Sequence, residues 1–243
     1  MLLGSTAILA ADDGLFTRQI TLKLDEAGTL PSKISASEKY LITNLKIVGK
    51  INGTDLKFIR EMAGRDVNGE KTDGKLSILD LSEAKIVAGG DAYISYNSLC
   101  ENTSNDKLGD FAFEGCSGLT SLTIPSSVTS IGNYAFVGCS GLISIYAYME
   151  KIPEFGYNVF NCNAKNCTVY VPTGTVDAYK SSEFGYFEKI VEFDATGIDK
   201  VTTSNDAKEL SRYSVNGQRL AAPTKGLNIV KYSDGSVKKV FVQ

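Results

Sequence analysis

The sequence predicts an α/β protein in which a solenoid of short parallel strands is followed by a small antiparallel β module. Two observations predict the solenoid: an internal repeat of 23 residues in the middle of the chain, and an L-x-x-L-x-L pattern that recurs upstream of it. A third observation, a pair of hairpin signals near the C-terminus, predicts the β module. A repeat of this length makes one strand and one return segment, which can bury an apolar side only by stacking on its neighbours.

The first residues, 1–14, are predicted to be the remnant of a signal peptide or a disordered arm. Met1–Ala11 is apolar and uncharged, but the basic region that precedes the apolar stretch of a signal peptide is missing. The solenoid is predicted to cover residues 15–193.

The early repeats of the solenoid are long and irregular. Segments 42–51 and 76–86 carry an L/I-x-x-L-x-L/I pattern, which is typical of a strand that turns alternate side chains inward. Between them, Leu56, Ile59 and Met62 share one helical face. These early repeats are therefore expected to return through helices.

The two most similar repeats lie next to each other in the chain. They are LGDFAFEGCSGLTSLTIPSSVTS at 108–130 and IGNYAFVGCSGLISIYAYMEK at 131–151, in which Phe113 corresponds to Phe136. The Phe-x-Gly-Cys segments are expected to form the return wall, opposite the strands.

Cysteines recur with the repeat, because Cys116, Cys139 and Cys162 are each separated by 23 residues. Cys162 is expected to continue the register, with a one-residue insertion after it and before VYVP at 169–172. Because a free cysteine behaves as a small hydrophobic residue, these three are expected to stack in a buried ladder. Cys167 could pair with Cys162 or stay unpaired.

Beyond residue 193 the composition becomes polar, which predicts a linker over 194–208. The small β module is predicted over 209–243. Asn216-Gly217 and Asp234-Gly235 each lie between alternating residues, and such pairs tolerate the positive φ angles that tight hairpin turns require. Four antiparallel strands are expected.

Composition excludes several classes of function. The 243 residues carry 25 basic and 28 acidic side chains, a net charge of −3, which does not favour nucleic acid as a partner. There is no histidine, so Ser-His-Asp and Cys-His catalysis and histidine-ligated metals are excluded. We expect no enzymatic activity, metal or other cofactor. No apolar run is long enough for a transmembrane segment.

The repeat resembles the BspA-like branch of the leucine-rich repeats. That family repeats I-P-x-x-V-x-x-I-G-x-x-A-F-x-G-C-x-x-L-x-x-L, and IPSSVTSIGNYAFVGCSGLISI at 124–145 matches it nearly residue for residue. The resemblance is specific over 108–193 and weaker over 20–90. It implies a leucine-rich repeat solenoid and an extracellular or cell-surface protein, associated with the outer membrane, that adheres to other cells or to host matrix proteins.

The C-terminal module resembles the sorting domains of Bacteroidetes proteins that use type IX secretion. The matching segments are Val215-Asn216-Gly217, Lys225–Val230 and Asp234-Gly235. Asn228 departs from the family pattern, which usually has an aromatic residue there. The module is therefore either a sorting signal or a structural cap.

The predicted ligand-binding surface is the concave face of the parallel sheet. Side chains alternate across a strand, so the x positions of L-x-x-L-x-L face solvent in every repeat. Aligning the repeats gives the candidate residues Lys46, Asp80, Thr123, Tyr146, Tyr148 and Tyr170. The three tyrosines should cluster, and clustered tyrosines are common in recognition surfaces.

The expected partner is a host or bacterial surface protein, which includes extracellular matrix proteins. Two alternatives are a carbohydrate-binding accessory protein, since exposed tyrosines also stack on glycans, and a structural spacer of the cell surface. A spacer would leave the concave face polar and featureless. A structural role of the tyrosines, in which they cover the sheet or meet the C-terminal module, is a separate alternative to the ligand face.

Overall fold

The computed structural model describes residues 14–96, 98–161, 163–193, 209–214, 219–220, 222–224, 226–232 and 237–242. The chain divides into two compact units, Met1–Ala195 and Thr196–Gln243. The predicted linker, the two predicted turn dipeptides and nearly all of the predicted N-terminal arm fall outside the described residues.

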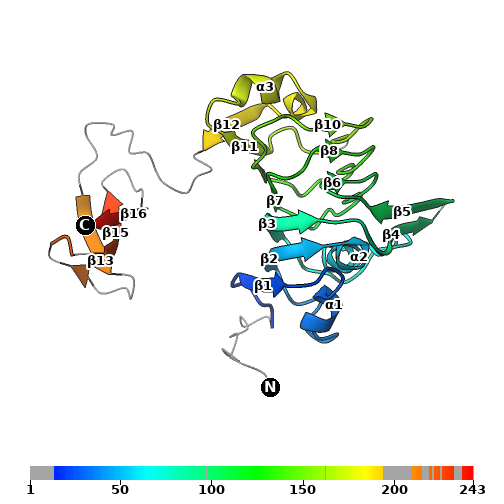
Figure 1. The fold of residues 1–243 in the computed structure, drawn as a ribbon, viewed down its shortest axis with the longest axis horizontal. Coiled ribbons are helices and arrows are strands. Elements are labelled where there is room, and N and C mark those ends of the chain that lie inside the picture. The colour runs from blue at the N-terminus through cyan, green and yellow to red at the C-terminus, as the bar shows by residue number, and fades with distance from the viewer. Residues whose placement is uncertain are drawn as a thin grey trace. The chain divides into compact units, whose positions relative to one another are not determined.

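The first unit is built on a parallel sheet of seven strands, ordered β1-β2-β3-β7-β9-β11-β12 (Figure 1). All its pairings are parallel, so the chain crosses back behind the sheet between one strand and the next. The strands are β1 (Ile20–Leu24), β2 (Asn44–Ile51), β3 (Ile78–Ile86), β7 (Ser121–Ile124), β9 (Ser144–Ala147), β11 (Thr168–Pro172) and β12 (Lys189–Phe193).

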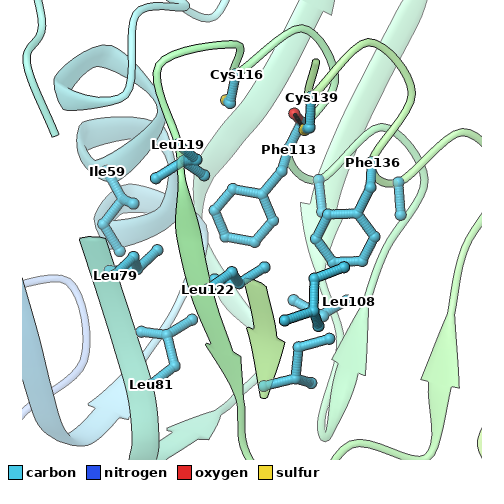
Figure 2. Close-up of a cluster of buried hydrophobic side chains, with 14 of the residues drawn as sticks. Ile59, Leu79, Leu81, Leu108, Phe113, Cys116, Leu119, Leu122, Phe136 and Cys139 are labelled. Atoms are coloured by element: carbon cyan, nitrogen blue, oxygen red, sulfur yellow. Dashed lines mark hydrogen bonds between the residues drawn. The ribbon is translucent and has the colours of Figure 1, made fainter. Parts of the chain in front are cut away.

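One face of this sheet forms the core, because alternate residues of each strand point inward. The pattern read from the sequence names these residues correctly, and each pair is almost fully buried: Leu45 and Ile47, Leu79 and Leu81, Leu122 and Ile124, Ile145 and Ala147, Val169 and Val171. Figure 2 shows Leu79, Leu81 and Leu122 facing a helix on one side and the return loops on the other. The intervening residues are left on the solvent face.

The return segments of the later repeats form a second wall. Its parallel strands are β6 (Lys107–Leu108), β8 (Ser130–Ile131) and β10 (Glu154–Phe155), ordered β10-β8-β6. Behind them, the rings of Phe113, Phe136 and Phe160 stack with centroids 5.6 and 5.5 Å apart. Phe113 and Phe136 lie beside Cys116 and Cys139 in the core (Figure 2).

The register predicted for the third repeat is wrong. Ser130 pairs with Glu154 and Phe136 stacks on Phe160, so the spacing is already 24 residues before the cysteine motif is reached. Asn163 donates its backbone N–H to Phe160 O, as Cys139 does to Phe136 O. The insertion therefore precedes the motif, and Asn163 occupies the position expected for Cys162, which lies outside the described residues.

Helices return the chain in the early repeats. α1 (Leu30–Lys33) is one turn, and α2 (Gly53–Met62) packs Leu56, Ile59 and Met62 into the core. α2 begins at a capping box, in which the Asn52 side chain accepts from Thr54 N and Asp55 accepts from Asn52 N.

Further segments flank the sheets of this unit. β4 (Gly89–Tyr96) and β5 (Leu99–Thr103) form an antiparallel hairpin, and β4 packs against α2 (Figure 1). At the other end, α3 (Val176–Lys180) and the 3-10 helix η1 (Glu183–Tyr186) bury Tyr179 and Phe184 over the last repeat.

The second unit contains one four-stranded antiparallel sheet, ordered β14-β13-β15-β16. Its strands are β13 (Glu209–Ser214), β14 (Arg219–Leu220), β15 (Gly226–Tyr232) and β16 (Val237–Val242). The Asn228 side chain is buried and accepts from Arg212 Nη1 and Thr224 N. The departure from the aromatic pattern thus supplies acceptors to a buried polar network.

Candidate functional site

The solvent face of the parallel sheet carries five of the six predicted residues in one continuous row. Lys46 pairs with Asp80, Asp80 with Thr123, Thr123 with Tyr146, and Tyr146 with Tyr170. In a parallel sheet, paired residues point to the same face about 4.8 Å apart. The structure therefore places these side chains beside one another, in the order in which the repeats follow along the chain.

The aromatic half of the row is a cluster of four rings. Tyr146 and Tyr170 stack with centroids 4.5 Å apart and ring planes inclined by only 8°. Phe193, at the end of β12, meets the rings of Tyr146 and Tyr148 edge-on, at 6.0 and 4.9 Å. Tyr148 is thus in the cluster, although it follows β9 and lies outside the row. We call Tyr146, Tyr148, Tyr170 and Phe193 the aromatic cluster.

All four side chains of the aromatic cluster are only half-buried. Within the described part of the chain, no hydrogen bond engages the three tyrosine hydroxyls. Burial raises the pKa of Tyr146 and of Tyr148, and neighbouring phenols or the charge of Asp80 act in the same direction. The hydroxyls of Tyr146 and Tyr148 are therefore protonated at neutral pH, and a phenol hydroxyl can both donate and accept a hydrogen bond to a partner.

The other half of the row is charged. Lys46 Nζ lies 2.6 Å from Glu83 Oε1 and 3.5 Å from Asp80 Oδ2. The hydrogen bond to Glu83 and the negative charge of Asp80 raise the pKa of Lys46, so the lysine stays positive. Thr123 lies between this ion-pair network and the aromatic cluster, and its small side chain separates the two halves.

A comparison with known families agrees with this arrangement. A family model for the BspA-type leucine-rich repeat region matches residues 93–217 in six copies, just over half of the chain. The chain belongs to the BspA-type leucine-rich repeat family. No curated protein matches the chain.

The BspA-type match extends beyond the segment that the sequence pattern singled out. The match begins at residue 93, inside β4, whereas the specific resemblance to the BspA-like repeat motif in the sequence begins at residue 108. The aromatic cluster and most of its supporting strands lie inside the matched region. Lys46 and Asp80 precede it, on β2, which is followed by α2, and on β3, which is followed by the β4–β5 hairpin.

Sequence reasoning missed Phe193 and Glu83 as members of this surface. Phe193 is the last residue of β12 and pairs with Pro172, so its position follows from the register of the final strand. The sequence signal that could have indicated Phe193 is its position as an aromatic residue at the end of the last apolar segment of the solenoid. Glu83 follows an irregularity in the β2–β3 pairing, which shifts the alternation and brings its carboxylate to Lys46.

Three cysteines in the described part of this BspA-type chain are buried, and Cys100 is exposed. Cys116 and Cys139 are buried, and burial raises the pKa of Cys116 to about 11 and that of Cys139 well above its ordinary value. Cys139 donates its thiol to Phe113 O at 3.0 Å. Cys167 is a free, buried thiol. Of the two alternatives that the sequence left open for Cys167, the structure therefore shows the unpaired one.

The described residues hold neither a metal-binding cluster nor a membrane-spanning helix. No group of three or more Cys, Asp or Glu side chains is placed to hold a metal ion. No helix there has the length and apolar character needed to cross a membrane.

Proposed function

We propose that this protein is a non-catalytic, adhesin-like member of the BspA-type family, which binds a protein partner through the solvent face of its parallel sheet. We also propose that the leucine-rich repeats form a continuous solenoid and that the protein acts outside the cell or at the cell surface. The partner would be a surface protein of a host or of another bacterium, and the C-terminal module would serve sorting or attachment.

The aromatic cluster is the observation that carries the proposal. Tyrosine and phenylalanine give a large contact area while losing little side-chain entropy, and here the rings already hold one another in place. The free phenol hydroxyls can satisfy polar groups of a partner as water is excluded. The adjacent Lys46, Asp80 and Glu83 network supplies charges at the rim, where they favour specificity more than affinity.

Ring geometry favours protein over carbohydrate as the ligand of this face. A sugar stacks on an open aromatic face, whereas Tyr146 and Tyr170 each cover one face of the other at 4.5 Å. Phe193 contacts Tyr146 and Tyr148 in edge-to-face arrangements. The cluster therefore offers mainly ring edges and hydroxyls, which suit a side chain or backbone of a protein.

The test is a binding screen of the purified full-length chain on arrays of matrix proteins and of glycans. The variant carries Tyr146→Thr and Tyr170→Thr, because threonine already occupies the same row at position 123. The matched control is Tyr157→Thr, which removes a tyrosine that is 65% exposed on the opposite wall.

The proposal predicts binding to protein spots that is lost in the double variant and kept in the control. Protein binding that the double variant retains would exclude the aromatic cluster as the site. Glycan binding that depends on the two tyrosines would support the carbohydrate alternative instead. Binding to neither array would favour the structural spacer.

A further inference from the structure

A small cavity lies on the other side of the first unit, where the β4–β5 hairpin meets the turn after α2. It has a volume of about 240 Å³ and is lined by Arg65, Asn68, Gly69, Tyr96 and Glu114. Pockets for drug-sized ligands usually have 300–1,000 Å³, so this cavity can take only a smaller molecule. It shares no residue with the aromatic cluster.

The hairpin and the turn hold the walls of this cavity firmly. Ser95 donates its backbone N–H to Val67 O at 2.8 Å, which ties β4 to the turn. Gly69 has a φ of 75°, and a Cβ there would lie 3.1 Å from the Tyr96 ring. Glycine at this position therefore permits both the turn and the close approach of the ring.

Arg65 brings a fixed positive charge to the cavity. Its Nε donates to Gly115 O at 3.1 Å and its Nη1 to Gly69 O at 2.6 Å. Both acceptors are neutral carbonyls, and no carboxylate in the described part of the chain lies within 4.0 Å of this guanidinium. Arg60, fully buried nearby, likewise donates only to carbonyl oxygens, those of Phe111 and Ala112.

Glu114 brings a negative charge to the same cavity. Its carboxylate accepts a hydrogen bond from the Tyr96 hydroxyl. Burial, together with this carboxylate, raises the pKa of Tyr96 to about 12, so the phenol keeps its proton and continues to donate. Among the described residues, no lysine or arginine nitrogen lies within 4.0 Å of the Glu114 carboxylate.

A cation and an anion thus line one cavity, each hydrogen-bonded to neutral groups, and among the described residues the two form no ion pair within 4.0 Å. We infer that the cavity binds a small zwitterion of the α-amino acid class. The ligand carboxylate would pair with the Arg65 guanidinium, which suits planar, bidentate recognition, and the ligand ammonium would pair with Glu114. Asn68 adds an amide that can donate or accept at the entrance.

Charge complementarity selects this ligand class over its neighbours. A simple anion would pair with Arg65 but would be repelled by Glu114. A simple cation would pair with Glu114 but would be repelled by Arg65. A neutral sugar could hydrogen-bond to both groups but would neutralise neither. A small molecule that carries both charges can pair with both groups, and the volume of about 240 Å³ favours a short one such as an α-amino acid.

The experiment is an NMR titration of the ¹⁵N-labelled full-length chain with glycine and L-alanine at millimolar concentrations. Acetate and methylammonium serve as the two halves of glycine, and methyl glucoside serves as the neutral sugar. The variant Glu114→Gln keeps an acceptor for Tyr96 but removes the charge. Glu70→Gln is the matched control, because Glu70 is exposed in the same turn and does not line the cavity.

The inference predicts that glycine and alanine shift the amide signals of residues 65–69, 96 and 114, while either half of glycine binds at least about tenfold more weakly. Glu114→Gln should weaken glycine binding by a similar factor, and Glu70→Gln should leave it unchanged. Acetate binding as well as glycine, sugar binding in preference to glycine, or unshifted cavity signals would each overturn it. The comparison of whole and half ligands uses the unaltered chain, so it decides the matter even where the variant is poorly folded.

Discussion

Replacing Asn163 by cysteine should stabilise the protein. Asn163 stands in the third repeat at the position that Cys116 and Cys139 occupy in the first two, and it is only 7% exposed. Among the described residues, neither the side-chain oxygen nor the side-chain nitrogen of Asn163 has a hydrogen-bond partner. A buried amide thus occupies a position where the preceding repeats bury a thiol.

The magnitude follows from the unsatisfied amide. A buried polar group without a partner costs about 1–3 kcal/mol in folding free energy relative to water, whereas cysteine behaves as a small hydrophobic residue of similar size. The surrounding repeat already accommodates a cysteine twice, with the thiol fully buried each time. We therefore expect Asn163→Cys to raise the free energy of unfolding by about 1–3 kcal/mol.

The assay is urea unfolding of the full-length chain in reducing buffer, followed by far-ultraviolet circular dichroism and tyrosine fluorescence. Asn166→Cys is the control, since Asn166 is exposed three residues away and should change the midpoint little. An unchanged or lower free energy for Asn163→Cys would refute the reasoning. It would mean that water satisfies the amide, or that Asn163 does not occupy the position of the ladder.

Three further outcomes follow from the packing and the pKa shifts. Phe136→Ala should lower the free energy of unfolding by about 3–5 kcal/mol in the same urea assay, because Phe136 stacks on a ring on either side. Alkylation followed by peptide mass spectrometry should label the exposed Cys100 in the folded protein but Cys116 only after unfolding, and equal labelling would contradict the buried ladder. Burial raises the pKa of Tyr93 and of Tyr179 in the folded state, so their contribution to stability is complete below the unfolded pKa of about 10 and is lost as pH rises above it. The urea midpoint should therefore fall as pH rises above about 10, and it should fall less steeply when both tyrosines are replaced by phenylalanine.

The row of site residues could be predicted because two periodicities coincide in it. Strand alternation decides which face a residue takes, and the repeat decides which residues pair across strands. Thr123, Tyr146 and Tyr170 could therefore be aligned from sequence, and the pairing of β7, β9 and β11 brings them together. The contact between Tyr146 and Tyr170 follows from this register alone.

The register of the third repeat could not be predicted, because a one-residue insertion leaves several alignments equally good in sequence. Matching Cys162 to Cys139 placed the insertion after the cysteine. Packing decides otherwise, since Phe160 must reach the ring of Phe136 and Glu154 must pair with Ser130. A cysteine contributes little to such a choice compared with a stacked aromatic ring.

The cavity beside the β4–β5 hairpin was equally hidden from the sequence, and its origin is physical. In the later repeats, backbone amides of one return loop donate to carbonyls of the next, as Phe113 N does to Ala135 O. The first of these loops, at 111–115, has α2 as its other neighbour, and the amides of α2 are used within the helix, so the carbonyls of the loop need side-chain donors. Arg60 and Arg65 provide them, at Ala112 O and Gly115 O.

This substitution of side chains for backbone donors has an electrostatic consequence. A backbone amide brings no net charge, whereas each arginine brings a positive charge that the carbonyl dipoles do not neutralise. Such charge is costly unless an anion or solvent compensates it. Arg60 and Arg65 therefore place positive charge where the helical repeats meet the short repeats. Glu114 and the cavity lie at the same place. The zwitterion proposed for this cavity would place its carboxylate on Arg65 and its ammonium on Glu114, so it would compensate one of these positive charges without leaving Glu114 unpaired.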